Sequence, residues 1–191
     1  MQINRKIINK PINNERVLLH ACCAGCSGEI IEALSYSDIK FAIYFYNPNI
    51  NTKEEYKKRL KDVERFANKK NIEFIPGPYD PEKWQQEIEG LEQEPERGAR
   101  CQACFRMRFK KAAEFAKNNN FNLLTSSLGI SRWKNLADIN TKGQEAVSNI
   151  IGLDYWDYNW RSQGGSERMY KIAKREKFYM QKYCGCSYSL L

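Results

Sequence analysis

The chain has 191 residues, of which 42% are hydrophobic and 28% are charged, and its formal net charge is +8. The hydrophobic content is ordinary for a globular protein and excludes an intrinsically disordered chain. A chain of this length buries roughly 70% of the surface that its unfolded form exposes, so it does not need a metal ion merely to fold. We therefore expect a single domain over residues 1–191, in which any bound metal serves chemistry.

Short apolar runs alternate with helical patterns along the chain. Strands are predicted at residues 15–22, 39–46, 72–75, 122–127 and 154–158. Helices are predicted at residues 28–36, 52–70, 81–91, 101–118, 134–149 and 169–182. This alternation predicts an α/β fold, with a parallel sheet flanked by helices on both faces. Such sheets bind ligands beyond the carboxyl ends of their strands.

Cysteines form three tight groups in the sequence. The seven cysteines are Cys22, Cys23, Cys26, Cys101, Cys104, Cys184 and Cys186. The N-terminal segment lacks the apolar core of a signal peptide, and no segment has the length of a membrane span, so we expect a cytoplasmic protein without membrane contact. Thiols stay reduced in that compartment, and clustered thiols there indicate metal binding rather than disulfides. The groups fall at the ends of predicted elements, which favours one metal site at the C-terminal ends of the strands.

Four thiolates suit either zinc or an iron–sulfur cluster. The single histidine, His20, disfavours mixed Cys/His zinc sites and Rieske centres. Seven thiols exceed one tetrahedral site and leave about three for a second metal or for catalysis. We interpret His20 either as a hydrogen-bonded residue that fixes the turn or as a catalytic proton donor. Asp157, at the end of the fifth predicted strand, is either a metal ligand with a catalytic role or part of a surface turn.

Basic stretches around residues 53–70, 106–111 and 168–177 favour a polyanionic partner such as RNA, although a merely solvated surface remains the alternative. Trp133 lies on a predicted loop, beside Lys134 at the start of the next predicted helix, and its ring can stack on an extruded base. Ser126, Ser127 and Ser131 offer hydroxyl groups at the end of the fourth strand. We predict these five residues to bind substrate.

Six motifs occur in an order that resembles one known family. They are LLHACCAGCS (18–27), FYNPNI (45–50), EYKKR (55–59), RCQACFRMR (100–108), TSSLGISRWKN (125–135) and YCGC (183–186). Together they are similar to the cobalamin-independent epoxyqueuosine reductases, over about residues 15–188. Gly25 and Arg132 stand where that family commonly has proline. Both departures lie beside the motif cysteines and serines rather than on them.

The resemblance implies a Rossmann-like fold of the nucleotide-binding HUP type and an oxidoreductase that reduces epoxyqueuosine in the tRNA anticodon loop to queuosine. It also implies a 4Fe–4S cluster, an adjacent metal ion that is iron or zinc, and an external electron donor such as a reductase or ferredoxin. The cluster ligands would be Cys23, Cys101, Cys104 and one of Cys184 and Cys186. The remaining cysteines and Asp157 would then surround the second metal. That metal would polarise the epoxide oxygen, and His20 or Asp157 would protonate it.

Two other functions compete with this one. An iron–sulfur-dependent tRNA-thiolating enzyme of the same architecture would need ATP, and the sequence has no phosphate-binding loop of the GxGxxG or GxxxxGK[S/T] type. A non-catalytic zinc protein that binds RNA would be colourless and would lack acid-labile sulfide.

Overall fold

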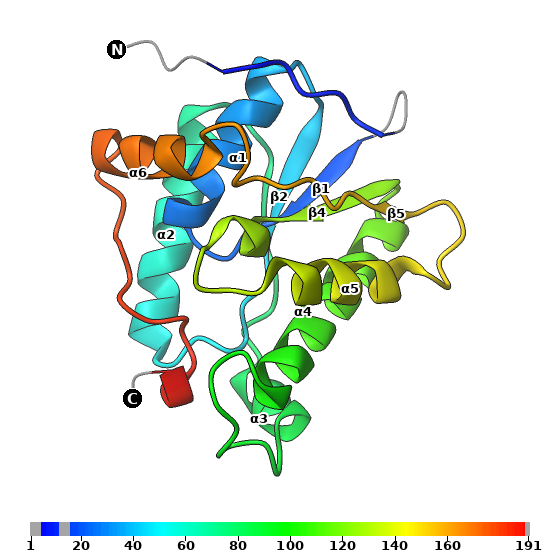
Figure 1. Cartoon of the computed structure of the whole chain (residues 1–191), viewed down its shortest axis with the longest axis vertical. Coiled ribbons are helices and arrows are strands. Elements are labelled where there is room, and N and C mark those ends of the chain that lie inside the picture. The colour runs from blue at the N-terminus through cyan, green and yellow to red at the C-terminus, as the bar shows by residue number, and fades with distance from the viewer. Residues whose placement is uncertain (1–4, 12–15, 190–191) are drawn as a thin grey trace.

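The computed structural model describes residues 5–11 and 16–189. A parallel sheet of five strands lies at its centre, in the order β3-β2-β1-β4-β5 (Figure 1). The strands are β1 (Val17–His20), β2 (Phe41–Phe45), β3 (Phe74–Pro76), β4 (Leu123–Ser126) and β5 (Asp154–Tyr155). They confirm the predicted α/β fold. Each strand is shorter than the run predicted for it, and Glu15 of the first predicted run lies outside the described residues.

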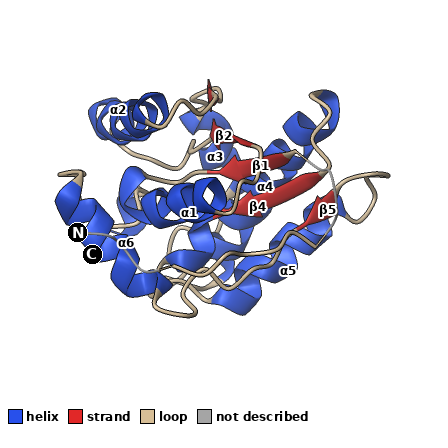
Figure 2. Ribbon diagram, turned by 90° about the horizontal axis from the view of Figure 1, so that it is seen from above, coloured by secondary structure: helices blue, strands red, loops and turns tan. Residues whose placement is uncertain are grey.

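Helices cover both faces of this sheet (Figures 1 and 2). They are α1 (Ala24–Tyr36), α2 (Lys53–Lys69), α3 (Pro81–Glu87), α4 (Ala99–Asn118), α5 (Leu136–Val147) and α6 (Gly165–Arg175), with the 3-10 turns η1 (Ser127–Ile130) and η2 (Ser187–Ser189). None of the helices in the described part of the chain has both the length and the apolar character needed to cross a bilayer.

Successive side chains of a strand point to opposite faces, and this alternation creates two apolar cores. Val17 and Leu19 of β1 pack in the core that α1, α2 and α6 cover. Leu18, between them, packs in the core that α4 and α5 cover. All three side chains are completely buried, as expected for a parallel sheet with helices on both faces.

The final helix is shorter than its sequence pattern predicts. It ends after Arg175 because Lys177 adopts a left-handed backbone conformation with φ of 52°. The Phe178 N–H then donates to the Ala173 carbonyl at 3.0 Å, which closes the helix as a Schellman motif does. Phe178 still packs on Phe66, with ring centroids 5.0 Å apart, so the apolar periodicity continues although the helix does not. The chain beyond α6 is therefore free to cross toward the cysteine motifs.

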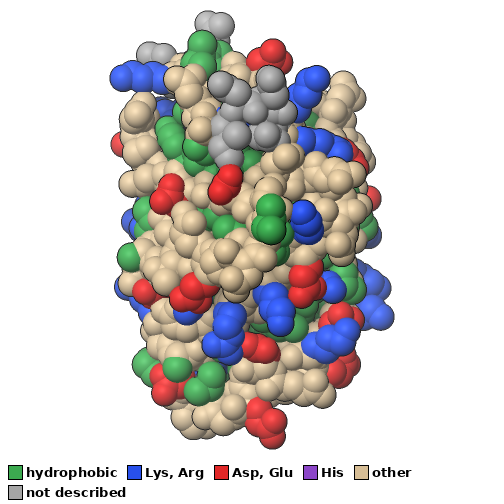
Figure 3. Space-filling model, turned by 90° about the vertical axis from the view of Figure 1, so that its right-hand side faces the viewer, with side chains coloured by type: hydrophobic (Ala, Val, Ile, Leu, Met, Phe, Trp, Pro, Cys, Tyr) green, Lys and Arg blue, Asp and Glu red, His purple; other side chains and the backbone are tan. Residues whose placement is uncertain are grey.

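Many of the basic residues are engaged in ion pairs between helices. Glu32 of α1 binds Lys70 at 2.8 Å and Arg175 at 2.6 Å, and Glu29 binds Arg168 at 2.8 Å. Burial acts to raise the pKa of Glu32, but its bonds to Lys70 and Arg175 outweigh burial and lower that pKa. On the face in Figure 3, Lys and Arg side chains lie among Asp and Glu, mostly in its lower half. The positive stretches thus hold α1, α2 and α6 together, in addition to any role in binding a polyanion.

Candidate metal centre

The carboxyl ends of β1 and β4 define the crevice of this fold. The two strands are direct neighbours, with His20 beside Ser126. The sheet continues from β1 through β2 to β3 on one side and from β4 to β5 on the other. In such sheets, a ligand binds where the strand order reverses, outside the carboxyl ends. The first cysteine motif follows β1 at this point.

Three thiols gather at the N-terminus of α1. The sulfur atoms of Cys22, Cys23 and Cys26 all lie within 4.8 Å of one another, and those of Cys22 and Cys23 are 3.9 Å apart. Cys23 is the N-cap of α1, and its sulfur accepts the Cys26 N–H at 3.4 Å. Ser127, from the end of β4, fixes Cys22: its hydroxyl accepts the Cys22 N–H at 2.9 Å and contacts the Cys22 sulfur at 3.2 Å. Both strand ends therefore position this group.

These three thiols share their protons unequally. Hydrogen bonds from Cys23 and Cys26 lower the pKa of Cys22 well below its ordinary value, and the charges of Lys134 and Arg108 act in the same direction, against burial. The bonds to Cys22 raise the pKa of Cys23 to about 12 and also raise that of Cys26. One thiolate stabilised by two thiols is a favourable starting point for metal binding, because the thiolate is the metal ligand.

The other four cysteines line a small cavity of about 20 Å³. Cys101 and Cys104 lie on the first turns of α4. Burial raises the pKa of Cys101 and raises that of Cys104 to about 11. Cys184 and Cys186 come from the irregular segment after α6. The thiols are therefore arranged as three plus four, whereas the expected ligand division placed Cys23 with Cys101 and Cys104.

Buried contacts hold the C-terminal cysteines in place. Arg59 of α2 donates to the Cys184 carbonyl at 2.9 Å and to the Tyr183 carbonyl at 3.4 Å. The Asn51 N–H donates to the Gly185 carbonyl at 2.8 Å. Arg59 is 2% exposed and is itself paired with Glu55. The segment thus docks against α2 and the loop before it.

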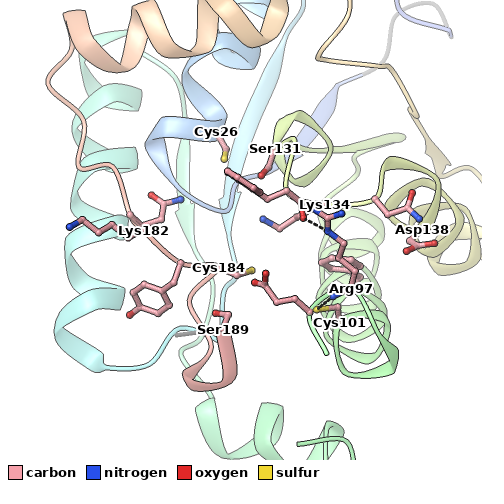
Figure 4. A pocket seen from close by; sticks show the side chains of 15 residues that line it. Cys26, Arg97, Cys101, Ser131, Lys134, Asp138, Lys182, Cys184 and Ser189 are labelled. Carbon is pink, nitrogen blue, oxygen red and sulfur yellow. Dashed lines mark hydrogen bonds between the residues drawn. The ribbon is translucent and has the colours of Figure 1, made fainter. Parts of the chain in front are cut away.

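A larger cavity of about 270 Å³ connects the cysteine groups (Figure 4). Its wall includes Cys26, Cys101 and Cys184, one from each motif, together with Ser131, Trp133, Lys134 and Asp138 from the segment after β4. Lys134 extends into this cavity. Burial acts to lower the pKa of Lys134, but its attraction to Cys184, Cys22 and Cys26 in their thiolate forms outweighs burial and raises it. The ammonium group is therefore the charged form at neutral pH.

His20, one of the two predicted proton donors, does not line the cavity. Its ring is completely buried, with Nδ1 2.9 Å from the Ser126 hydroxyl and Nε2 3.0 Å from the Tyr46 carbonyl. A carbonyl only accepts, so Nε2 carries the proton and Nδ1 accepts from Ser126. Burial and the charge of Arg108 lower the pKa of His20 to about 3. His20 is therefore neutral and joins β1, β2 and β4, which is the first of the two interpretations of this residue.

Asp157 also lies away from the thiols. Its side chain is exposed, and it lines neither the large nor the small cysteine cavity. β5 is the edge strand and ends at Tyr155. Beyond it, Trp156 and Trp160 are buried in the core, whereas the Asp157 side chain between them faces solvent. The structure therefore does not bring Asp157 to the metal site or to the reacting atoms. Asp138 of α5 is the aspartate that lines the large cavity.

The predicted substrate-binding residues divide into two groups. Ser126 and Ser127 are buried and bonded inward, to His20 and Cys22 respectively, so they support the site rather than face a ligand. Ser131, Trp133 and Lys134 line the cavity, and their role in binding substrate stays a prediction. Trp133 is 64% exposed at the rim, with the Arg132 guanidinium 4.7 Å from its ring centroid.

Sequence reasoning missed Arg97, Gln181 and Arg108, which contact or act on the thiols. The Arg97 N–H donates to the Cys101 sulfur at 3.2 Å. Gln181 lines the cavity, and its amide donates to the Cys23 sulfur at 2.8 Å. The sequence pattern predicts a helix at Gln181, so it does not indicate this contact with Cys23. Arg108 is buried on α4, and its charge acts on Cys22 and Cys104. The sequence could have indicated Arg108, because Cys101, Cys104 and Arg108 follow one another at spacings of three and four. These spacings place the three side chains on one face of a helix.

The donor set fits a soft metal or an iron–sulfur cluster. Thiols dominate the potential ligands that the structure assembles here, with the carboxylates of Glu96 and Asp138 also in the cavity walls. The single histidine of the chain is bonded elsewhere. All seven cysteines are free rather than paired in disulfides. Thiolate-rich sites select zinc, Cu(I) or iron–sulfur clusters over hard cations. The site is thus a metal-binding thiol centre.

Comparison with known proteins supports the fold and identifies the family. The fold resembles that of the U34-tRNA thiolase NcsA from Methanococcus maripaludis with its 4Fe–4S cluster, with a TM-score of 0.60 and 14% identity over 94% of this chain and 63% of that chain. At this identity the likeness shows the α/β fold alone.

The sequence relatives are much closer. The chain is 53% identical to epoxyqueuosine reductase QueH of Acinetobacter baylyi, over 94% of this chain and 83% of that protein. It is 52% identical to epoxyqueuosine reductase QueH of Haemophilus influenzae, over 97% of this chain and 76% of that protein. A family profile described as epoxyqueuosine reductase QueH matches residues 17–191. The chain belongs to the epoxyqueuosine reductase QueH family, as the motifs indicated.

Proposed function

We propose that this protein is a single-domain cytoplasmic oxidoreductase that reduces epoxyqueuosine in the tRNA anticodon loop to queuosine, with an iron–sulfur cluster and without cobalamin. Family membership supports the activity. The observation that carries the chemistry is the gathering of cysteines from three distant motifs at the carboxyl end of the sheet. Five of them line two cavities that share Cys101 and Cys184, and Cys22 and Cys23 lie beside Cys26.

The grouping of the thiols favours a revised ligand assignment. The four thiols of Cys101, Cys104, Cys184 and Cys186 around the small cavity form the set that suits the cluster. The three thiols at the N-terminus of α1 form the set for a second metal, iron or zinc, without Asp157. When bound, such groups supply single electrons and polarise an oxygen atom.

Removing the epoxide oxygen to leave an alkene consumes two electrons and two protons and releases water. The electrons come from an external donor, a reductase or a ferredoxin. Lys134 holds a proton at Nζ inside the cavity, where its charged ammonium is placed to donate a hydrogen bond to the departing oxygen. It replaces His20, which is neutral and bonded away from the cavity. Lys134 thus combines a positive charge with access to the reacting centre.

The rim of the cavity suits a nucleic acid. Trp133 presents an exposed ring on which a base from the anticodon loop can stack. Arg97 and Lys182 line the same cavity and carry positive charges toward a phosphate backbone. Arg97 also donates to the Trp133 carbonyl at 2.9 Å, so the loop that carries the ring is tied to the loop before α4 (Figure 4). Contact by stacking and phosphate binding is the usual way in which proteins hold single-stranded RNA loops.

The test uses protein purified without oxygen. Iron and acid-labile sulfide are measured per chain, and the protein is incubated with epoxyqueuosine-containing tRNA and dithionite, with neither ATP nor cobalamin added. Mass spectrometry of the digested tRNA should show the nucleoside lighter by one oxygen atom. Cys104→Ser, which keeps the size of the buried side chain, should lose both iron and turnover. A colourless zinc protein, or a reaction that requires ATP, would refute the proposal.

A further inference from the structure

Arg108 is a buried cation without a matching anion among the described residues. Its side chain is 1% exposed on α4, one turn after Cys104. One guanidinium nitrogen donates to the side-chain oxygen of Asn47, and Nε has no hydrogen-bond partner. Within the described part of the chain, no carboxylate lies within ion-pair distance of Arg108. A buried charge of this kind is strongly unfavourable unless something compensates it.

The other buried arginines show how this protein normally compensates such a charge. Arg5 pairs with Glu29 at 2.9 Å, and Arg59 pairs with Glu55 at 2.7 Å. Arg100, which also lacks a carboxylate partner, is held by backbone carbonyl oxygens, those of Glu92, Glu94 and Tyr188. Arg108 has the single amide of Asn47. It is therefore the buried arginine that has least compensation within the described residues.

The groups around Arg108 indicate where its anion lies. Arg108 follows Cys104 of the four-thiol group by four residues on α4, so the two buried side chains share one face of the helix. Asn47 also donates to the Ala21 carbonyl at 2.9 Å, which ties Arg108 to the residue before Cys22. The other groups near Arg108 carry no negative charge, because Asn47 is an amide, His20 and Tyr46 are neutral and Lys134 is a cation. The thiols are the groups here that become anionic, and they do so fully when they bind metal.

We propose that Arg108 supplies the fixed positive charge that balances an anionic metal–thiolate centre built from these cysteines, and that it thereby raises the reduction potential of that centre. The proposal rests on the metal centre of the proposed function. An added electron makes the centre more negative, and a guanidinium in a water-poor interior stabilises that charge more strongly than one at the surface. Arg108 is thus a positioning residue that acts through the thiolates rather than on the substrate.

The test compares two substitutions. Arg108→Gln keeps an amide donor for Asn47 but removes the charge, whereas Arg108→Lys keeps the charge. Anaerobic potentiometric titration of the loaded proteins should give Arg108→Gln a more negative midpoint potential than the wild type, and Arg108→Lys should recover most of the shift. Metal affinity of Arg108→Gln should fall roughly 10- to 100-fold, the usual effect of losing a residue that supports metal ligands.

A matched control lies on the same helix. Arg106 is exposed and paired with Glu87 at 2.7 Å, so Arg106→Gln removes the same charge in water and should leave the midpoint potential unchanged. The metal-free proteins provide a readout that needs no loaded centre. Without metal, Arg108→Gln should be about as stable to heating as the wild type, because the thiols take on their full negative charge only when they bind metal.

The outcomes separate the two proposals. A loaded Arg108→Gln protein with the wild-type potential, or a metal-free one clearly less stable than the wild type, would mean that Arg108 is only a packing residue. A metal-free Arg108→Gln protein that folds but no longer loads metal supports the inference. A wild-type protein that binds no metal would overturn the proposed metal centre, and this inference with it.

Discussion

Replacing Ser127 by alanine tests whether the end of β4 holds the first thiol group in place. The Ser127 hydroxyl accepts the Cys22 N–H at 2.9 Å and contacts the Cys22 sulfur at 3.2 Å, and both residues are buried. Ser127→Ala leaves the Cys22 N–H without this acceptor, and such a loss costs about 1–3 kcal/mol of unfolding free energy. For a chain of this size, each kcal/mol lowers Tm by about 2–4 °C. We therefore expect Tm to fall by about 2–12 °C.

The assay is thermal unfolding of the metal-free protein, followed by circular dichroism. Ser131→Ala is the matched control, because Ser131 lies in the same segment and its hydroxyl makes no hydrogen bond with the described residues. Its Tm should stay within about 2 °C of the wild type, since substitutions away from such contacts change stability by about 0.5 kcal/mol or less. If Ser127→Ala and Ser131→Ala unfold at the same temperature, Ser127 does not fix Cys22 and the reasoning fails.

Three further predictions follow from the cavity and from the ion pairs. Trp133→Ala should weaken tRNA binding roughly 5- to 150-fold, as measured by filter binding, since base stacking is worth about 1–3 kcal/mol. Thermal unfolding should show an unchanged Tm, because the ring is 64% exposed. Asp157→Asn should keep wild-type metal content and turnover, whereas Asp138→Asn, inside the cavity, should lower turnover; loss of metal from Asp157→Asn would restore the original ligand assignment. The pKa of Glu32 is lowered in the folded protein, although burial opposes this, so its stabilising effect is present above pH 4.5, the ordinary value, and is lost as pH falls below it. The difference in unfolding free energy between the wild type and Glu32→Gln should therefore shrink on acidification, and a difference constant with pH would contradict this linkage.

The sequence by itself determined the architecture and the family. Apolar runs alternating with amphipathic segments were enough for a parallel α/β sheet, because a strand buried on both faces has to be apolar throughout, as Val17, Leu18 and Leu19 are. The order of the cysteine motifs was enough for the family and for a thiol-based metal site, since each motif falls at the end of an element. These features depend on the order of residue types along the chain, which is the same before and after folding.

Only the tertiary structure decided which of the marked residues share the site. His20 and Asp157 both stand at strand ends in the sequence, but whether a side chain faces the crevice or the interior depends on which strands are neighbours. His20 is enclosed between β2 and β4, and Asp157 follows the edge strand, so neither faces the thiols. Lys134 and Arg108 carry the charges around the thiols instead.

The C-terminal segment shows most clearly what the sequence predicted and what only the tertiary structure decided. Its periodicity predicted one helix over residues 169–182, and the apolar positions are indeed buried as far as Phe178. The left-handed backbone at Lys177 ends the helix earlier and frees Gln181 to donate to the Cys23 sulfur. Periodicity records which side chains are buried, but it does not record the path of the backbone between them. The grouping of the cysteines as three plus four depends on that path, and so it came from the tertiary structure alone.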